Sequence, residues 1–168
     1  MYLIIYHHKG YIDKFLGDGF MAIFEHGYAL DQDTALNAVK SGMDIHRALK
    51  HKNRTLRKVY GADKNIKVRV GISTGEIYAM LLGNYIKTEF TYLGNSVNLA
   101  SKLESLATKQ FMLIDEQTHI LVKERIRSDP EQISIPGLGE TTAYKVLRLA
   151  RMYERSYSEE MPSIRPTP

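Results

Sequence analysis

Hydrophobic residues recur with two different periods along the chain, and each period predicts a different kind of element. From Asp31 to Tyr60, apolar residues return every three or four positions, which is typical of an amphipathic helix. Asp31 or Asp33 is a suitable cap for the start of that helix, and Gly61 is a suitable stop. From Ile66 to Ile72, apolar positions alternate with lysine, arginine and glycine, which predicts a half-buried strand.

The rest of the chain divides into short apolar runs separated by turn residues. Tyr11–Leu16 and Phe20–Glu25 flank Gly17-Asp18-Gly19, a pattern that predicts a β-hairpin. Met1–His8 is apolar from its first residue, as though a helix were entered partway, and we expect the domain to begin upstream. Strands are also expected at Glu76–Leu82, Phe90–Leu93, Phe111–Ile114, Ile133–Ile135 and Ala143–Leu147, and helices at Ser96–Ala107 and Glu116–Arg125. This mixture predicts an α+β or α/β domain.

Composition narrows the class of protein. The 168 residues suit one domain, and 43% hydrophobic with 25% charged residues is ordinary for a globular chain. The absence of cysteine excludes disulfides, thiolate zinc sites and cysteine nucleophiles. A net charge of +4 is too weak to indicate nucleic-acid binding. No apolar run approaches the ~18 residues of a membrane span. We expect a cytoplasmic location, which leaves open a membrane anchor elsewhere in a longer parent protein.

Three local motifs are only weak evidence for a functional site when each is taken alone. Residues 71–75 match the G-x-S-x-G pattern of a hydrolase nucleophile, but a strand rather than a helix is expected after them. Asp18 lies on a tight turn, where a carboxylate can bind Mg²⁺ or simply face solvent. Asn98 and Lys102 are four residues apart on a predicted helix, so they share a face. That face is suited to a ribose and a phosphate, or is an ordinary polar surface.

Three blocks, taken in order, are far more specific. They read KGYIDKFLGDGFMAIF at 9–24, VRVGISTGE at 68–76 and FTYLGNSVNLASKLE at 90–104. The first resembles the K-x-x-G-D-G hairpin of class III nucleotidyl cyclases, the second their G-I-H-T-G-E turn, and the third their Y-T-V-I-G-D-x-V-N-x-A-x-R-L-E block. The resemblance extends over roughly residues 8–147.

The resemblance implies a fold and an activity. The fold is an α+β sandwich with a ferredoxin-like core sheet and flanking helices, here lacking the family's first strand. Residues 1–150 are expected to form this partial catalytic domain, and residues 151–168, with three prolines in the last seven positions, a flexible tail. Family members convert ATP or GTP to the 3′,5′-cyclic nucleotide and pyrophosphate. They use two divalent ions, Mg²⁺ or Mn²⁺, at a dimer interface.

Five residues match functional positions of the family. Asp18 matches a metal-binding aspartate, and Lys14 and Thr91 match the pair that selects the base. Asn98 matches the residue that orients the ribose. Lys102 stands where the family has an arginine that stabilises the transition state. A lysine donor suits adenine N1, and a threonine hydroxyl accepts from the 6-amino group. Guanine demands carboxylate acceptors, which neither Lys14 nor Thr91 offers. ATP is therefore the expected substrate.

The sequence also departs from the family pattern. The D-I-x-G-F segment that carries the other metal-binding aspartate does not occur in it, and Pro136 stands where a phosphate-binding lysine is usual. Lys102 keeps the charge of the usual arginine but loses its bidentate fork. We therefore expect an adenylate cyclase of low activity that forms a homodimer or a domain-swapped assembly. The alternative is a catalytically degenerate module that dimerises or regulates. A diguanylate cyclase would require a G-G-[DE]-E-F turn, which Leu16–Phe20 does not supply.

Overall fold

The computed structural model describes residues 1–25, 31–61, 65–86, 88–108 and 111–154. Its elements, in chain order, are α1 (Tyr2–His7), β1 (Tyr11–Leu16), β2 (Gly19–Ile23), α2 (Gln32–Tyr60), β3 (Val70–Ile72), β4 (Tyr78–Gly83), β5 (Thr88–Leu93), α3 (Asn95–Leu106), β6 (Met112–Ile114), α4 (Glu116–Val122), β7 (Ile126–Ile135) and β8 (Gly139–Leu149). This mixed α+β architecture confirms the predicted fold class. Residues 151–154 are helical, and the remainder of the expected tail lies outside the described residues.

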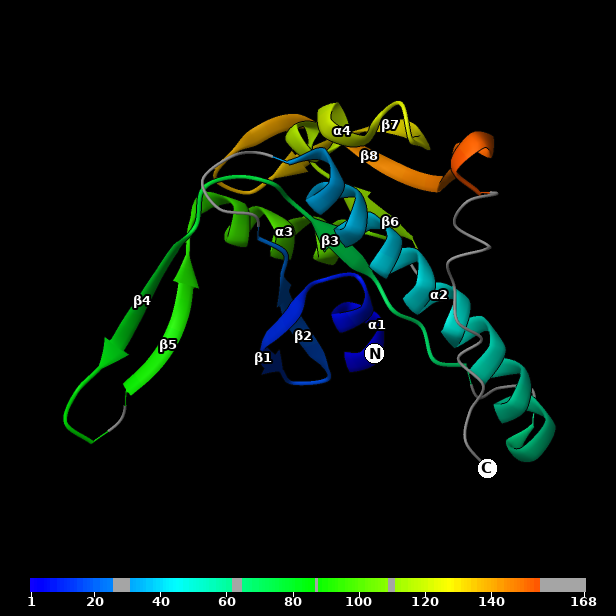
Figure 1. Cartoon of the computed structure of the whole chain (residues 1–168), viewed down its shortest axis with the longest axis horizontal. Coiled ribbons are helices and arrows are strands. Elements are labelled where there is room, and N and C mark those ends of the chain that lie inside the picture. The colour runs from blue at the N-terminus through cyan, green and yellow to red at the C-terminus, as the bar shows by residue number, and fades with distance from the viewer. Residues whose placement is uncertain (26–30, 62–64, 87, 109–110, 155–168) are drawn as a thin grey trace.

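The strands form three separate sheets. The central one has the order β3-β6-β8-β7, in which β3 and β6 are parallel and the other pairs are antiparallel. The other two are the β1-β2 hairpin and the β4-β5 pair. Figure 1 shows β4 and β5 reaching away from the rest of the molecule as an arm, with α1 and the hairpin lying below the central sheet.

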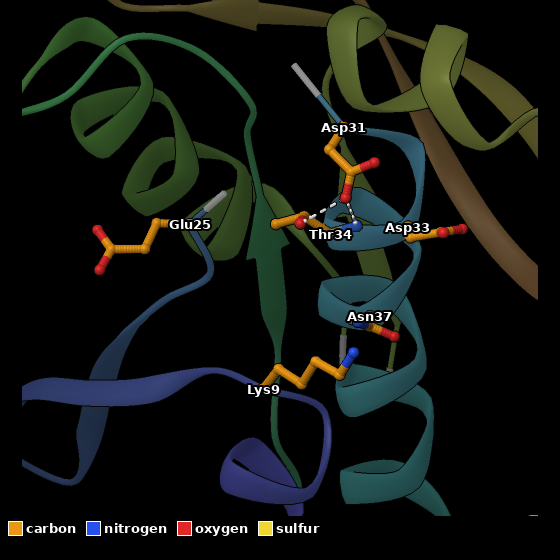
Figure 2. Close-up of a pocket in the computed structure, with 6 residues that line it drawn as sticks. All are labelled: Lys9, Glu25, Asp31, Asp33, Thr34 and Asn37. Carbon is orange, nitrogen blue, oxygen red and sulfur yellow. Dashed lines mark hydrogen bonds between the residues drawn. The ribbon is translucent and has the colours of Figure 1, made fainter. Parts of the chain in front are cut away.

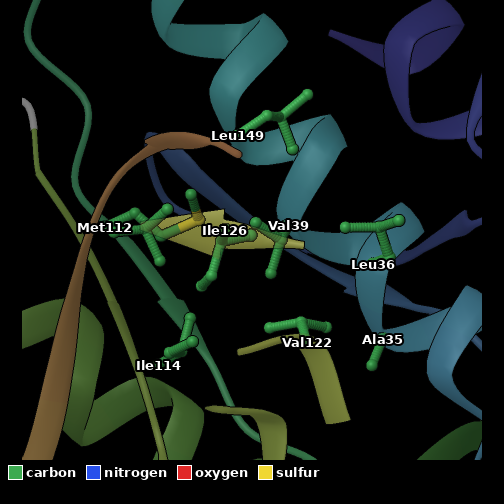
Figure 3. Close-up of a cluster of buried hydrophobic side chains, with 9 residues drawn as sticks. Ala35, Leu36, Val39, Met112, Ile114, Val122, Ile126 and Leu149 are labelled. Atoms are coloured by element: carbon green, nitrogen blue, oxygen red, sulfur yellow. The ribbon is translucent and has the colours of Figure 1, made fainter. Parts of the chain in front are cut away.

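Helix α2 covers one face of the central sheet. It begins where Asp31 accepts a hydrogen bond from the Thr34 amide at 2.8 Å, and it ends at Gly61, whose φ of 91° interrupts the helix. Of the two aspartates predicted as caps, Asp31 is the one that caps the helix, and the predicted stop at Gly61 is confirmed. Apolar residues from α2, α4 and the sheet form the main core, part of which Figure 3 shows: Ala35, Leu36, Val39, Met112, Ile114, Val122, Ile126, Val146 and Leu149. Burying these side chains holds the layers together.

Helix α3 covers the opposite face. Its Leu103, with Ala107, packs against Leu113 of β6 and Ala143 of β8. Successive residues of a strand point to opposite faces, so Met112 and Ile114 contact α2 while Leu113 contacts α3. The sheet is thus sandwiched between helices, and α3 holds a fixed position relative to β3 and β6.

A third cluster attaches the hairpin to the body. Ile4 and Ile5 of α1 pack against Ile45 of α2, and residues of both hairpin strands surround them. The His8 ring lies 2.9 Å from the Asp44 carboxylate, and both side chains are buried. This contact ties the end of α1 to the middle of α2 and so fixes the start of the hairpin.

Three strands differ clearly in length from the sequence prediction. The expected strand Ile66–Ile72 is paired only over Val70–Ile72, because its partner β6 has only three residues. The strands expected at Ile133–Ile135 and Ala143–Leu147 are longer, and β7 runs through Pro130. Proline lacks the N–H needed for a central strand, but β7 is at the edge of the sheet, where this loss is tolerated.

Replacing Gly71 with alanine tests the close approach of β3 to α3. A Cβ at Gly71 would lie 2.1 Å from the Ala100 carbonyl oxygen and 2.3 Å from the Glu104 backbone nitrogen. Because helix backbone atoms cannot swing aside, we expect Gly71→Ala to lower the free energy of unfolding by about 3 kcal/mol in chemical denaturation. Gly19→Ala is the matched control, since its Cβ would lie 3.6 Å from the Leu16 oxygen. Equal losses in the two variants would contradict the packing argument.

Candidate active site

The β1-β2 hairpin contains an irregularity that determines which residues face the arm. Tyr11 pairs with Ile23 and Ile12 with Ala22, but the next pair is Lys14 with Met21, so Asp13 is an extra residue in β1. This is a β-bulge. In a regular strand, residues 11 and 14 would point to opposite faces. The bulge instead places Tyr11 and Lys14 on the same face.

Both of these side chains contact strand β5. The Lys14 ammonium donates a hydrogen bond to the Thr91 hydroxyl at 2.5 Å, and the hydroxyls of Tyr11 and Tyr92 are hydrogen-bonded to each other. The Lys14 side chain is 32% exposed. The structure therefore brings together Lys14 and Thr91, which are 77 residues apart in the sequence.

The contact between Tyr11 and Tyr92 joins the hairpin strand β1 to strand β5. Tyr92 is buried, and the two rings have centroids 6.3 Å apart. Burial, followed by the hydrogen bond to Tyr92, raises the pKa of the Tyr11 hydroxyl, so Tyr11 remains a neutral donor and acceptor. Sequence reasoning missed both tyrosines, because an aromatic residue in a strand is usually an ordinary packing residue.

Asn98 and Lys102 lie on α3, as their spacing predicted. Asn98 is exposed, and Lys102 donates a hydrogen bond from Nζ to the Pro136 carbonyl oxygen at 2.9 Å. The loop with Pro136, where the family pattern has a lysine, is therefore adjacent to Lys102. An exposed amide and a cation on one helix face can bind a sugar hydroxyl and a phosphate.

A polar network holds β4 and α3 at the end of β3. The buried Asp115 carboxylate accepts a hydrogen bond from the Ser73 hydroxyl at 2.7 Å and from the Thr118 amide at 2.9 Å. On the other side of the turn, the Ser96 hydroxyl donates to the Glu76 carbonyl oxygen at 3.2 Å. The G-x-S-x-G match is therefore a structural turn, because the Ser73 hydroxyl is engaged with a carboxylate that caps a helix.

Asp18 lies in the β1-β2 turn. Its side chain is exposed and makes no hydrogen bond or ion pair with another described residue. An exposed carboxylate together with substrate phosphates can bind Mg²⁺, which takes hard oxygen ligands and retains several waters. Within the described ranges no group of three or more histidine, aspartate or glutamate side chains is arranged to hold a metal ion. Asp18 is thus a single exposed carboxylate, and its role in binding a metal ion is taken up below as a proposal.

A separate polar pocket lies at the start of α2. Figure 2 shows the six residues that line this pocket of about 280 Å³: Lys9, Glu25, Asp31, Asp33, Thr34 and Asn37. None of the predicted site residues is among them. Asp31 caps α2 and Asp33 forms an ion pair with Arg125, so these two carboxylates already stabilise the fold. This polar pocket is therefore separate from the contact between hairpin and arm.

Comparison with known proteins gives a consistent result. The family model for the adenylate and guanylate cyclase catalytic domain matches residues 1–148. A terminal-differentiation-specific adenylate cyclase of Dictyostelium discoideum is 37% identical over 141 residues, which are 83% of this chain. An adenylate cyclase of Anabaena cylindrica is 32% identical over 141 residues, or 81% of the chain.

A solved structure agrees with the sequence relatives. The crystal structure of the adenylyl cyclase CyaB from P. aeruginosa superposes with a TM-score of 0.80 at 30% identity, covering 89% of this chain and 77% of that one. The chain spans only 6% of the Dictyostelium protein and 26% of the Anabaena protein. No helix in the described part of the chain is both long and apolar enough to cross a membrane.

Proposed function

Because the chain belongs to the family of adenylate and guanylate cyclase catalytic domains, we propose that it acts in an adenylate cyclase, which converts ATP to 3′,5′-cyclic AMP and pyrophosphate. The observation that carries this choice is the contact between Lys14 and Thr91. Two relatives that match more than four fifths of this chain are named adenylate cyclases, whereas two that match 58% of it or less are named guanylate cyclases.

The choice of ATP over GTP rests on hydrogen-bonding capacity. A lysine ammonium only donates, and it matches the lone pair of adenine N1. The Thr91 hydroxyl already accepts one hydrogen bond from Lys14 and has acceptor capacity left for the 6-amino group. Guanine would present an N1–H donor to the ammonium, and two donors facing each other leave a buried polar group unpaired.

Residues of α3 are proposed to bind the rest of the nucleotide. Asn98 orients the ribose, whose 3′-oxygen bonds to the α-phosphorus as the bond to pyrophosphate breaks. Lys102 balances charge on the phosphates. Its ammonium has three donors, and one is used by the Pro136 carbonyl, so two are available.

Asp18 is the residue proposed to bind the divalent ion, Mg²⁺ or Mn²⁺. When bound, such an ion stabilises the charge of the attacking oxygen and of the triphosphate. A lone carboxylate holds it weakly, so we expect low turnover from residues 1–168. The same observation favours the second candidate function, a degenerate cyclase module that dimerises without turnover.

The active assembly is proposed to be a homodimer or a domain-swapped assembly. Each site in it takes Asp18 from one subunit and Lys14, Thr91 and Asn98 from the other. The exposed arm supports this arrangement. Its exposed apolar side chains include Leu81 and Phe90, which are cross-strand partners. A two-stranded sheet is only marginally stable in water unless something covers it.

The metal role of Asp18 is tested by Asp18→Asn. We expect wild-type residues 1–168 to form cAMP slowly with Mn²⁺ and ATP, and the variant to fall at least ~10-fold, since the carboxylate ligand is lost. Asp129→Asn, an exposed change on β7, is the matched control and should retain wild-type activity. Product formation by Asp18→Asn within about twofold of wild type would exclude a metal-binding role. No cAMP from the wild type, with ATP still bound, would favour the degenerate module.

Base choice is tested by the double change Lys14→Glu with Thr91→Cys. Donor and acceptor roles then reverse, and each mismatched buried partner costs about 1–3 kcal/mol. We expect the ratio of ATP to GTP affinity to fall by at least ~10-fold, measured by calorimetric titration. Lys123→Glu, an exposed charge reversal after α4, is the control. An unchanged ratio in the double variant would show that these residues do not touch the base.

Self-association is tested by sedimentation velocity at micromolar concentration. We expect a dimer with an interface above ~1,000 Å². Leu81→Lys places a charge on the arm and should weaken the dimer at least ~10-fold, because a charge would be buried without a partner. Ile120→Lys, on the exposed side of α4, should leave it intact. A wild-type monomer at high concentration would contradict the proposed assembly.

A further inference from the structure

The extra residue of the β1 bulge is itself unusual. The Asp13 side chain is only 5% exposed, and its Oδ2 atom is buried without a hydrogen-bond partner in the described structure. The nearest charge is the Lys14 ammonium, with Nζ 3.3 Å from Oδ2. This is ion-pair distance without hydrogen-bond geometry. An aspartate is thus buried beside the residue assigned to read the base.

Burying a carboxylate that has no hydrogen bond is costly, and a neighbouring cation must offset the cost. Here that cation is Lys14, which cannot move away without leaving Asp13 uncompensated. Lysine otherwise has a flexible four-carbon stem and a mobile charge. Its contacts with both Asp13 and Thr91 therefore restrict the movement of the ammonium.

The bulge explains how the side chains of two neighbouring strand residues, Asp13 and Lys14, can contact each other. In a regular strand, side chains at 13 and 14 would lie on opposite faces of the hairpin. Because Asp13 is skipped in the pairing, its carboxylate lies beside the Lys14 ammonium and not across the strand from it. A packing role alone would be filled better by an apolar residue, since replacing buried ionic groups by apolar ones is often neutral or stabilising.

We propose that Asp13 is a positioning residue for purine recognition, which acts by holding the Lys14 ammonium against Thr91 with one N–H directed to the ring edge of the nucleotide. The proposal rests on the function proposed above for Lys14 and Thr91 and adds a third residue to that site. Asp13 acts through Lys14 and not on the base itself, because its side chain is only 5% exposed. Its contribution is preorganisation: the donor is in place before the nucleotide arrives.

The decisive change is Asp13→Asn, which keeps the size of the side chain and removes its charge. The readout is calorimetric binding of 3′-deoxy-ATP and 3′-deoxy-GTP, which lack the nucleophilic 3′-hydroxyl and cannot be cyclised. We expect Asp13→Asn to reduce the preference for the adenine nucleotide by about 10-fold, because the Lys14 ammonium then loses its well-placed hydrogen bond to the base. Asp129→Asn, the same chemical change on exposed β7, should leave the preference unchanged.

A double-mutant cycle separates positioning from a general effect on the fold. If Asp13 acts through Lys14, then adding Asp13→Asn to Lys14→Met should change the preference by less than about twofold. Thermal unfolding of each variant shows whether the fold is intact. A purely structural Asp13 would lower the melting temperature and weaken both nucleotides equally.

The outcomes distinguish this inference from the function on which it rests. The inference is supported if Asp13→Asn loses the preference for the adenine nucleotide and if the same change causes no further loss in the Lys14→Met background. A wild-type protein that prefers the adenine nucleotide, with Asp13→Asn unchanged, overturns the role of Asp13 and leaves the proposed function standing. A wild-type protein that binds neither nucleotide overturns both.

Discussion

The bulge at Asp13 is the constraint on which the candidate site depends. It shifts the pairing of β1 by one residue, so that Tyr11 and Lys14 both face β5. Without it, one of the two contacts between hairpin and arm would be lost, because strand side chains alternate in direction. Bulges recur beside active sites for this reason: one inserted residue re-aims a side chain without changing the fold.

The rest of the structure fixes the position of the β1-β2 hairpin relative to the β4-β5 arm. The hairpin is held by α1 and α2, through a cluster centred on Ile4, Ile5 and Ile45. The arm continues directly into α3, and α3 lies against β3 so closely that only a glycine fits at Gly71. Packing on the two faces of one central sheet therefore determines where the residues proposed to read the base and to bind the ribose lie relative to each other.

Much of this organisation could be predicted from the sequence, and the exceptions have physical causes. The hairpin, α2 and α3 are local, with clear periodicity or turn residues, and they were predicted within a few residues. The length of β7 was not, since only its place at the sheet edge makes Pro130 acceptable. The pairing of Lys14 with Thr91 was inferred from a family resemblance, because no periodicity links residues so far apart. The bulge at Asp13 leaves no periodic signal in a six-residue strand, although an aspartate amid apolar residues was a visible anomaly.

The central claim is that hairpin and arm together form a purine-reading site. The most direct test is a crystal structure of the protein with 3′-deoxy-ATP and Mn²⁺. The account predicts that the adenine edge lies within hydrogen-bonding distance of Lys14 Nζ and Thr91 Oγ1, with the ribose near an Asn98 side chain. A nucleotide bound in the polar pocket beside Lys9 and Thr34, or an adenine ring that contacts neither Lys14 nor Thr91, would contradict it.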